Sequence, residues 1–126
     1  MTPVSYRLTV VQKTGYLHAV VAGENSKETV ARYLEEILRE CAARNCHRLL
    51  IEERLEGPRL GTTSVFEIAA EGSDHAQGHF DAIAYVDVNA EGNRMGFAET
   101  VAVNRGLPLR VFSSVRDAED WLLGKG

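Results

Sequence analysis

Two histidines and two aspartates lie close together in the middle of the chain, within Asp74-His75-Ala76-Gln77-Gly78-His79-Phe80-Asp81. Imidazole and carboxylate groups are ligands that zinc accepts in proteins. Histidines four residues apart share a face only on a helix, however, and Gly78 favours a loop because glycine adopts conformations that are closed to other residues. We therefore predict a solvated connection at this segment and no metal ion.

Three carboxylates stand near the predicted ends of strands, namely Glu52, Glu53 and Asp87. In open α/β sheets, ligands bind in the crevice outside the carboxyl ends of the strands. Asp87 is placed to line such a crevice, and we take it as the candidate ligand contact. The alternative is a solvated residue before a turn, since aspartate favours exposed turn positions.

The motifs of common catalytic and nucleotide-binding sites are missing from the sequence. Gly57 and Gly61 are too few for a phosphate-binding loop and lack the lysine that follows in that motif. No serine or cysteine is paired with a histidine at a recognisable spacing. Cys41 and Cys46 match neither a redox pair nor half of a zinc site, and we expect them to be reduced structural thiols. We expect no catalytic residues and no cofactor, although a triad assembled in space leaves no such motif.

The composition is that of an ordinary globular domain. Of the 126 residues, 44% are hydrophobic and 25% are charged, close to average usage. The net charge of −4 disfavours nucleic acid as a partner, because phosphate backbones attract basic surfaces. The N-terminus lacks the pattern of a secretion signal, and no apolar run approaches the roughly 20 residues of a membrane span. We expect one cytoplasmic domain over residues 1–126, with no membrane span.

Period-two alternation and apolar runs predict five strands. Residues 6–11 and 16–22 alternate as strands do, and the segment Gln12-Lys13-Thr14-Gly15 between them is typical of a hairpin turn. The run Leu49-Leu50-Ile51 predicts a strand that is buried on both faces. The three later strands are predicted over residues 47–53, 80–88 and 107–112.

The first two predicted helices differ in the clarity of their patterns. Ser26 is a suitable N-cap for the first, because its hydroxyl can accept an unpaired N–H of the first turn. An apolar stripe follows at three- and four-residue steps, from Val30 to Cys41. The second helix opens at Thr62-Thr63-Ser64, where Ser64 and Glu67 match a capping box. Residues 72–78 are polar and contain two glycines, so we predict a loop there.

Two more helices follow. One is predicted from residue 93 to 105, with Gly106 after its end because glycine tolerates a positive φ. The other begins with a capping box at Ser114 and Asp117 and ends near Leu123. The predicted order is ββαβαβαβα. Alternating strands and helices favour parallel pairing, so we predict an α/β fold with a mixed five-stranded sheet and four helices.

The C-terminal third carries a connected set of motifs: Phe97-Ala98-Glu99, Val101-Ala102-Val103-Asn104-Arg105-Gly106, Leu109-Arg110-Val111-Phe112, and Ala118 with Trp121-Leu122. This set resembles the closing signature of bacterial SpoIIAA-like proteins. The resemblance implies a STAS-type fold, in a group that is loosely joined with STAS and Sec14 domains. The residues of the signature are typical core and capping residues, so they bear on the fold rather than on a function.

The resemblance also implies one candidate regulatory site. In anti-sigma-factor antagonists of the STAS family, a serine at the start of the helix after the third strand is phosphorylated. Thr62, Thr63 and Ser64 occupy that region here, and a phosphate at a helix N-terminus would change a docking surface. The sequence there is Arg59-Leu60-Gly61-Thr62-Thr63-Ser64, without the short Asp-Ser motif of those antagonists. The alternative is that these hydroxyls only cap the helix.

Three functions remain open from the sequence. The first is a non-enzymatic domain that docks a protein partner around the second helix, which exposure of Phe66 or Leu60 would support. The second is a domain that binds a small apolar molecule or lipid, which an apolar pocket of a few hundred Å³ would support. The third is an enzyme, which a cavity with several perturbed titratable groups would support. A homodimer is expected only because it is the commonest assembly.

Overall fold

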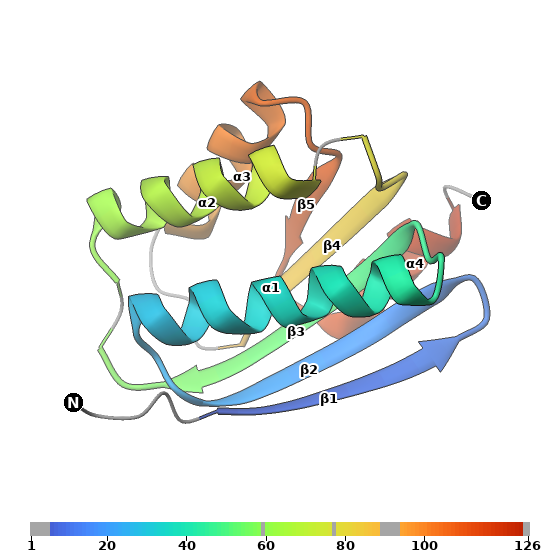
Figure 1. The fold of residues 1–126 in the computed structure, drawn as a ribbon, viewed down its shortest axis with the longest axis horizontal. Coiled ribbons are helices and arrows are strands. Elements are labelled where there is room, and N and C mark those ends of the chain that lie inside the picture. The colour runs from blue at the N-terminus through green and yellow to red at the C-terminus, as the bar shows by residue number, and fades with distance from the viewer. Residues whose placement is uncertain (1–5, 59, 77, 89–93, 125–126) are drawn as a thin grey trace.

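The computed structural model describes residues 6–58, 60–76, 78–88 and 94–124. Its elements follow the order ββαβαβαβα, as predicted (Figure 1). The five strands are β1 (Tyr6–Lys13), β2 (Tyr16–Glu24), β3 (Arg48–Glu56), β4 (Ala82–Asp87) and β5 (Leu109–Phe112). The four helices are α1 (Lys27–Ala43), α2 (Thr62–Ala76), α3 (Arg94–Asn104) and α4 (Val115–Gly124).

The strands form one mixed sheet in the order β1-β2-β3-β4-β5. The hairpin pair β1–β2 is antiparallel, and the other three pairs are parallel. Each parallel pair is joined through a helix, since a short turn cannot connect two parallel strands. The prediction of an α/β fold with a mixed five-stranded sheet and four helices is therefore confirmed.

The helices lie on both faces of the sheet. Figure 1 shows α1 and α2 in front of the sheet and α4 behind it. Ala102 of α3 packs in the same core cluster as Ile37 of α1, so α3 shares the front face. Alternate residues of β3 point to the two faces: Leu49 and Ile51 join the front cluster, and Leu50 joins the cluster under α4. The central strand is thus buried on both sides, as its apolar run predicted.

Two of the three predicted N-caps are correct. The Ser26 hydroxyl oxygen accepts the Thr29 N–H at 3.1 Å, and the Ser114 hydroxyl accepts the Asp117 N–H at 3.2 Å. Gly106 has φ +85° and follows α3, as expected for the residue after a helix. None of the helices in the described residues is long and apolar enough to cross a membrane.

The capping box predicted in α2 is wrong. The helix begins at Thr62, so Ser64 lies inside the first turn, and the Val65 N–H bonds the Gly61 carbonyl at 3.1 Å. Glu67 instead forms an ion pair with Lys27 of α1. Glu67, which the local pattern assigned to a cap, therefore contributes to the tertiary contact between α1 and α2.

The loop predicted over residues 72–78 is also wrong in its first part, because α2 continues to Ala76. Ser73 and Ala76 are buried, and the Ser73 hydroxyl donates to the Ala69 carbonyl at 2.6 Å. Packing in the front core cluster, to which Ala76 belongs, stabilises this last turn in spite of the low helix propensity of Gly72, since tertiary contacts override a weak local preference.

Candidate ligand-binding pocket

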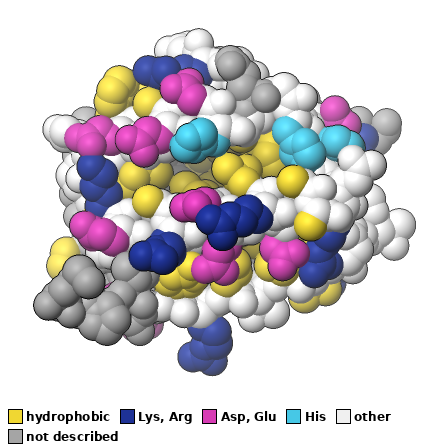
Figure 2. Space-filling view, viewed as in Figure 1, with side chains coloured by type: hydrophobic (Ala, Val, Ile, Leu, Met, Phe, Trp, Pro, Cys, Tyr) yellow, Lys and Arg dark blue, Asp and Glu magenta, His cyan; other side chains and the backbone are white. Residues whose placement is uncertain are grey.

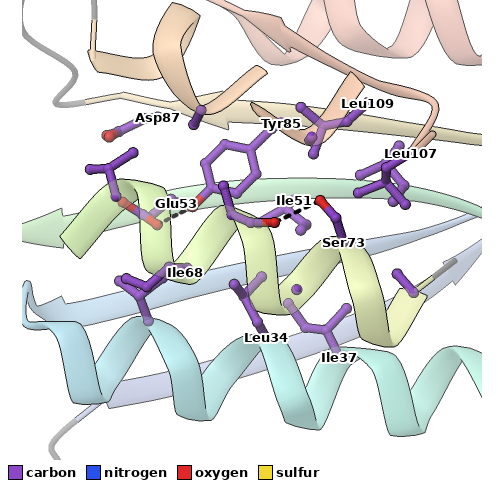
Figure 3. Close-up of a pocket in the computed structure, with 18 of the residues that line it drawn as sticks. Leu34, Ile37, Ile51, Glu53, Ile68, Ser73, Tyr85, Asp87, Leu107 and Leu109 are labelled. Atoms are coloured by element: carbon purple, nitrogen blue, oxygen red, sulfur yellow. Dashed lines mark hydrogen bonds between the residues drawn. The ribbon is translucent and has the colours of Figure 1, made fainter. Parts of the chain in front are cut away.

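A cavity of about 150 Å³ lies between the front face of the sheet and helices α1, α2 and α3. Its walls are mainly aliphatic side chains from all three helices, the sheet and the segment before β5. Figure 3 shows six of them around the space: Leu34, Ile37, Ile51, Ile68, Leu107 and Leu109. The pocket therefore offers an apolar molecule contact on several sides.

Small residues on the inner sides of two helices leave this space open. Ala69, Gly72, Ser73 and Ala76 of α2 line the pocket, as does Ala98 of α3. A Cβ added at Gly72 would meet no atom within 4 Å. Side chains this short cannot reach the sheet, so the helices stand over it without filling the gap.

The pocket lies on the face of the molecule that Figure 2 presents. Hydrophobic side chains are visible there between rows of charged side chains on the exposed sides of α1 and α2. The ion pair between Lys27 and Glu67 joins the two helices across this region. A molecule in the pocket would thus lie between the two helices with charged residues around it.

Two acidic side chains lie at one end of the pocket. Glu53 of β3 and Asp87 of β4 are register partners on adjacent strands, and both line the cavity (Figure 3). They are 4% and 9% exposed, respectively. Buried carboxylates are rare unless hydrogen bonds or charges stabilise them. This end of the pocket is therefore polar, in contrast to its aliphatic walls.

Two tyrosine hydroxyls stabilise the Glu53 carboxylate. Tyr33 of α1 and Tyr85 of β4 both donate to its Oε2 atom, and their hydroxyls also contact each other. Burial, and then the negative charge of Glu53, raise the pKa of Tyr33 and of Tyr85 well above the ordinary tyrosine value. Both hydroxyls therefore stay protonated and act as donors.

This cluster is better suited to recognition than to proton transfer. A general acid or base works best when its pKa lies near the working pH, whereas the environment moves both tyrosine pKa values further from neutrality. The Ser73 hydroxyl, the other hydroxyl of the described lining, is bonded to the Ala69 carbonyl. The perturbed group that lines the cavity, Tyr85, therefore has its pKa shifted away from the range that acid–base catalysis needs.

Of the sequence-predicted site residues, Asp87 lies in the pocket wall and is buried rather than solvated. Glu52 points to the opposite face of the sheet, where it bonds His18 at 3.0 Å and pairs with Arg54. The sequence pattern marks Glu53 only as a carboxylate near a strand end, without the ligand role given to Asp87. Tyr33 and Tyr85 carried no signal, because each fits an ordinary core position in its own element.

The candidate phosphorylation site lies at the beginning of α2. Thr62, Thr63 and Ser64 form the start of α2; Thr63 is exposed and Ser64 is half-buried. Thr63 and Ser64 are not among the described residues that line the cavity. Leu60 does line it and is half-buried, whereas Phe66 is 44% exposed.

The histidine-rich segment forms no metal cluster in the described part of the chain. His75 lies in the last turn of α2, whereas the His79 ring packs 4.8 Å from that of His47, centroid to centroid. The His47 Nδ1 atom is 2.7 Å from the His79 carbonyl oxygen, so this ring is held by the backbone. The two histidines that are close in sequence thus belong to different local environments.

Comparison with solved structures shows that the chain has the SpoIIAA-like fold. An anti-sigma factor antagonist from Mycobacterium paratuberculosis matches with a TM-score of 0.62 and 19% identity. An uncharacterised protein of the DUF3478 family with a SpoIIAA-like fold, from Shewanella loihica PV-4, matches with a TM-score of 0.57 and 20% identity. Each comparison covers 97% of both chains. No family model and no curated protein matches the sequence.

Proposed function

We propose that this protein binds a small, mainly apolar molecule in the pocket between the sheet and α1, α2 and α3. The observation that carries the proposal is the cavity of about 150 Å³ with aliphatic walls. It is smaller than the few hundred Å³ expected of a drug-sized site. An apolar cavity of roughly this volume nevertheless accommodates a benzene-sized molecule. The pocket therefore suits a single ring, a short chain, or the apolar end of a longer molecule.

Titration with toluene tests this proposal, with amide chemical shifts as the readout. We expect toluene to shift the amides of pocket residues such as Ile51, Ile68 and Leu107, because burial of its apolar surface is favourable. Gly72→Leu places a side chain into the open space at the pocket wall. This variant should weaken toluene binding by about tenfold or more.

Gly96→Leu is the matched control. Gly96 is exposed in α3, has open space at its Cβ position, and is not among the described lining residues. Both substitutions remove a helical glycine and add the same side chain, so both gain similar helix propensity. The Gly96 variant should bind toluene as the wild type does. Absence of pocket shifts in the wild type, or equal affinity of all three proteins, would contradict the proposal.

Protein docking around α2 is the second candidate, favoured by the exposure of Phe66. Phe66 is 44% exposed, and the Arg105 guanidinium lies 6.0 Å from the centroid of its ring. Aromatic and arginine side chains are enriched at the energetic centres of interfaces. Native mass spectrometry of protein from its own host separates the two candidates. A retained partner, or phosphate on Thr62, Thr63 or Ser64, supports docking, and a retained small molecule supports the pocket.

A further inference from the structure

Helix α4 covers only part of the back face of the sheet. It packs there on β3, β4 and β5 (Figure 1), and the Tyr16 hydroxyl at the start of β2 donates to its Glu119. Thr9 and Val11 of β1 are exposed, and Val20 of β2 is half-buried. The described residues therefore leave the back of β1 and of most of β2 without a covering helix.

We call this uncovered surface the open strip. Leu8 and Val10 of β1 pack in the front core, so the residues between and beside them point to the back, as alternate residues of a strand do. The same alternation holds along β2 after its first residue. The open strip consists of these back-facing residues: Arg7, Thr9, Val11, Lys13, His18, Val20 and Ala22.

The part of the open strip on β1 combines an apolar centre with basic side chains at both ends. Val11 is 43% exposed, and Arg7 and Lys13 are exposed as well. The strand contains no acidic residue. A surface that complements it would present an exposed apolar side chain together with carboxylates.

The carboxylates of the neighbouring strands do not cancel this pattern. Glu52 of β3 is bonded to His18 at 3.0 Å and paired with Arg54, so cationic and imidazole groups beside it compensate its charge. Glu24 and Glu56 are register partners at the last positions of β2 and β3, beyond the pairing of β1. The basic character of the β1 side is therefore retained.

The exposed side of α4 has the complementary features. Asp117, Asp120 and Leu123 recur at three-residue steps and are exposed, whereas Leu122 faces the sheet. Leu123 is 54% exposed. Arg116, near the start of the helix, is the one basic residue on this side, so the carboxylates are in excess.

The open strip and α4 lie next to each other on one face of the sheet, in an arrangement that a second copy can match. A two-fold axis parallel to the strands would place the α4 of each copy on the open strip of the other. The two α4 helices would then lie in one layer between the two sheets. Such an interface is isologous, so each of its contacts forms twice.

We propose that the open strip binds α4 of a second copy of this chain, which makes the protein a two-fold dimer. Rotation about an axis along the strands preserves the position along them. Leu122 packs with Tyr16 at the start of β2, so the end of α4 lies near the level of Val11. Leu123 thus meets Val11 of the second copy, and Asp117, earlier in the helix, lies toward its Arg7.

Sedimentation velocity over a series of protein concentrations tests this dimer. We expect the wild type to sediment with twice the mass of one chain in the micromolar range. Val11→Asp should raise the dimer Kd at least about tenfold, because it buries a charge at an apolar contact. Val103→Asp is the matched control, since Val103 is 51% exposed on α3, which shares the front face. It should leave the Kd unchanged.

A charge exchange tests the orientation of the two copies. Arg7→Asp and Asp117→Arg should each raise the dimer Kd at least about threefold, because each places like charges opposite one another. The double variant has the net charge of the wild type and should recover most of the affinity. A monomeric wild type, equal effects of the two valine variants, or no recovery in the double variant would overturn the proposal. The pocket lies on the other face, so the toluene titration is decided independently.

Discussion

Replacing Leu122 with alanine is expected to lower the free energy of unfolding by about 2–5 kcal/mol. Leu122 is fully buried in α4, where it packs in one cluster with Leu50 and Val86 of the sheet. Truncation removes buried apolar surface and leaves a space that the surroundings close only in part. Among the described helices, α4 is the one that covers this face of the sheet (Figure 1), so no neighbouring helix is available to fill the gap.

Leu123→Ala is the matched control, since the next residue in the chain is also leucine but is 54% exposed. Its truncation should change the free energy of unfolding by less than about 0.5 kcal/mol, as is usual for surface positions. Denaturant unfolding measures both variants against the wild type. Equal losses in the two variants would mean that α4 does not dock on the sheet through the face assigned to it.

Tyr33→Phe is expected to lower the free energy of unfolding by about 1.5–3 kcal/mol, because it removes a hydrogen bond to a buried charged group. The Tyr33 hydroxyl donates to Glu53 at a fully buried position, and the phenylalanine ring fills nearly the same volume. The loss therefore reports the hydrogen bond rather than the packing. Tyr85 keeps its own bond to the same carboxylate, so the variant should still fold.

Tyr6→Phe provides the comparison at the surface. The Tyr6 hydroxyl also donates to a glutamate, Glu36, but this bond is exposed to solvent. Exposed bonds of this kind contribute little, so we expect a change below about 0.5 kcal/mol. If Tyr33→Phe costs no more than Tyr6→Phe, the cluster around Glu53 does not stabilise the fold in the way its geometry indicates.

The tyrosine cluster also predicts a loss of stability in alkaline solution. The pKa of Tyr33 is raised in the folded state by burial and by Glu53, above the ordinary value of 10.0. The contribution of the Tyr33 hydroxyl to the free energy of unfolding is therefore fully present below pH 10.0. It is lost as the pH rises further, because the unfolded chain then releases a proton that the folded chain retains. The stability difference between wild type and Tyr33→Phe should shrink by about 1.4 kcal/mol per pH unit above that value.

The local patterns of the chain were sufficient for most of the element order. The Ser26 and Ser114 caps, the stripe of α1 and the glycine after α3 each involve residues within a few positions of one another. Their signals are therefore complete within a short stretch of sequence. The doubly buried β3 could be predicted for the same reason, since its run Leu49-Leu50-Ile51 leaves no polar residue for a solvent face.

The two wrong predictions in α2, its capping box and the loop after Ile68, arise from contacts between residues that are far apart in the sequence. Gly72 and the polar residues after Ile68 favour a loop when they are considered alone, yet the helix continues to Ala76 because Ser73 and Ala76 are buried against other elements. Glu67 matched a local cap but pairs with Lys27, 40 residues earlier in the chain. A local pattern contains no information on such partners, so tertiary contacts decided the length and docking of α2.

The sequence by itself determined the class of fold, the order of its strands and helices, and one residue of the candidate site, Asp87, from its position at the end of a strand. Only the tertiary structure brought Tyr33, Glu53 and Tyr85 together, since they come from α1, β3 and β4. The pocket beside them also depends on the tertiary structure. Its volume is the space that the small side chains of α2 and α3 leave over the sheet, and that space exists only once the helices have packed.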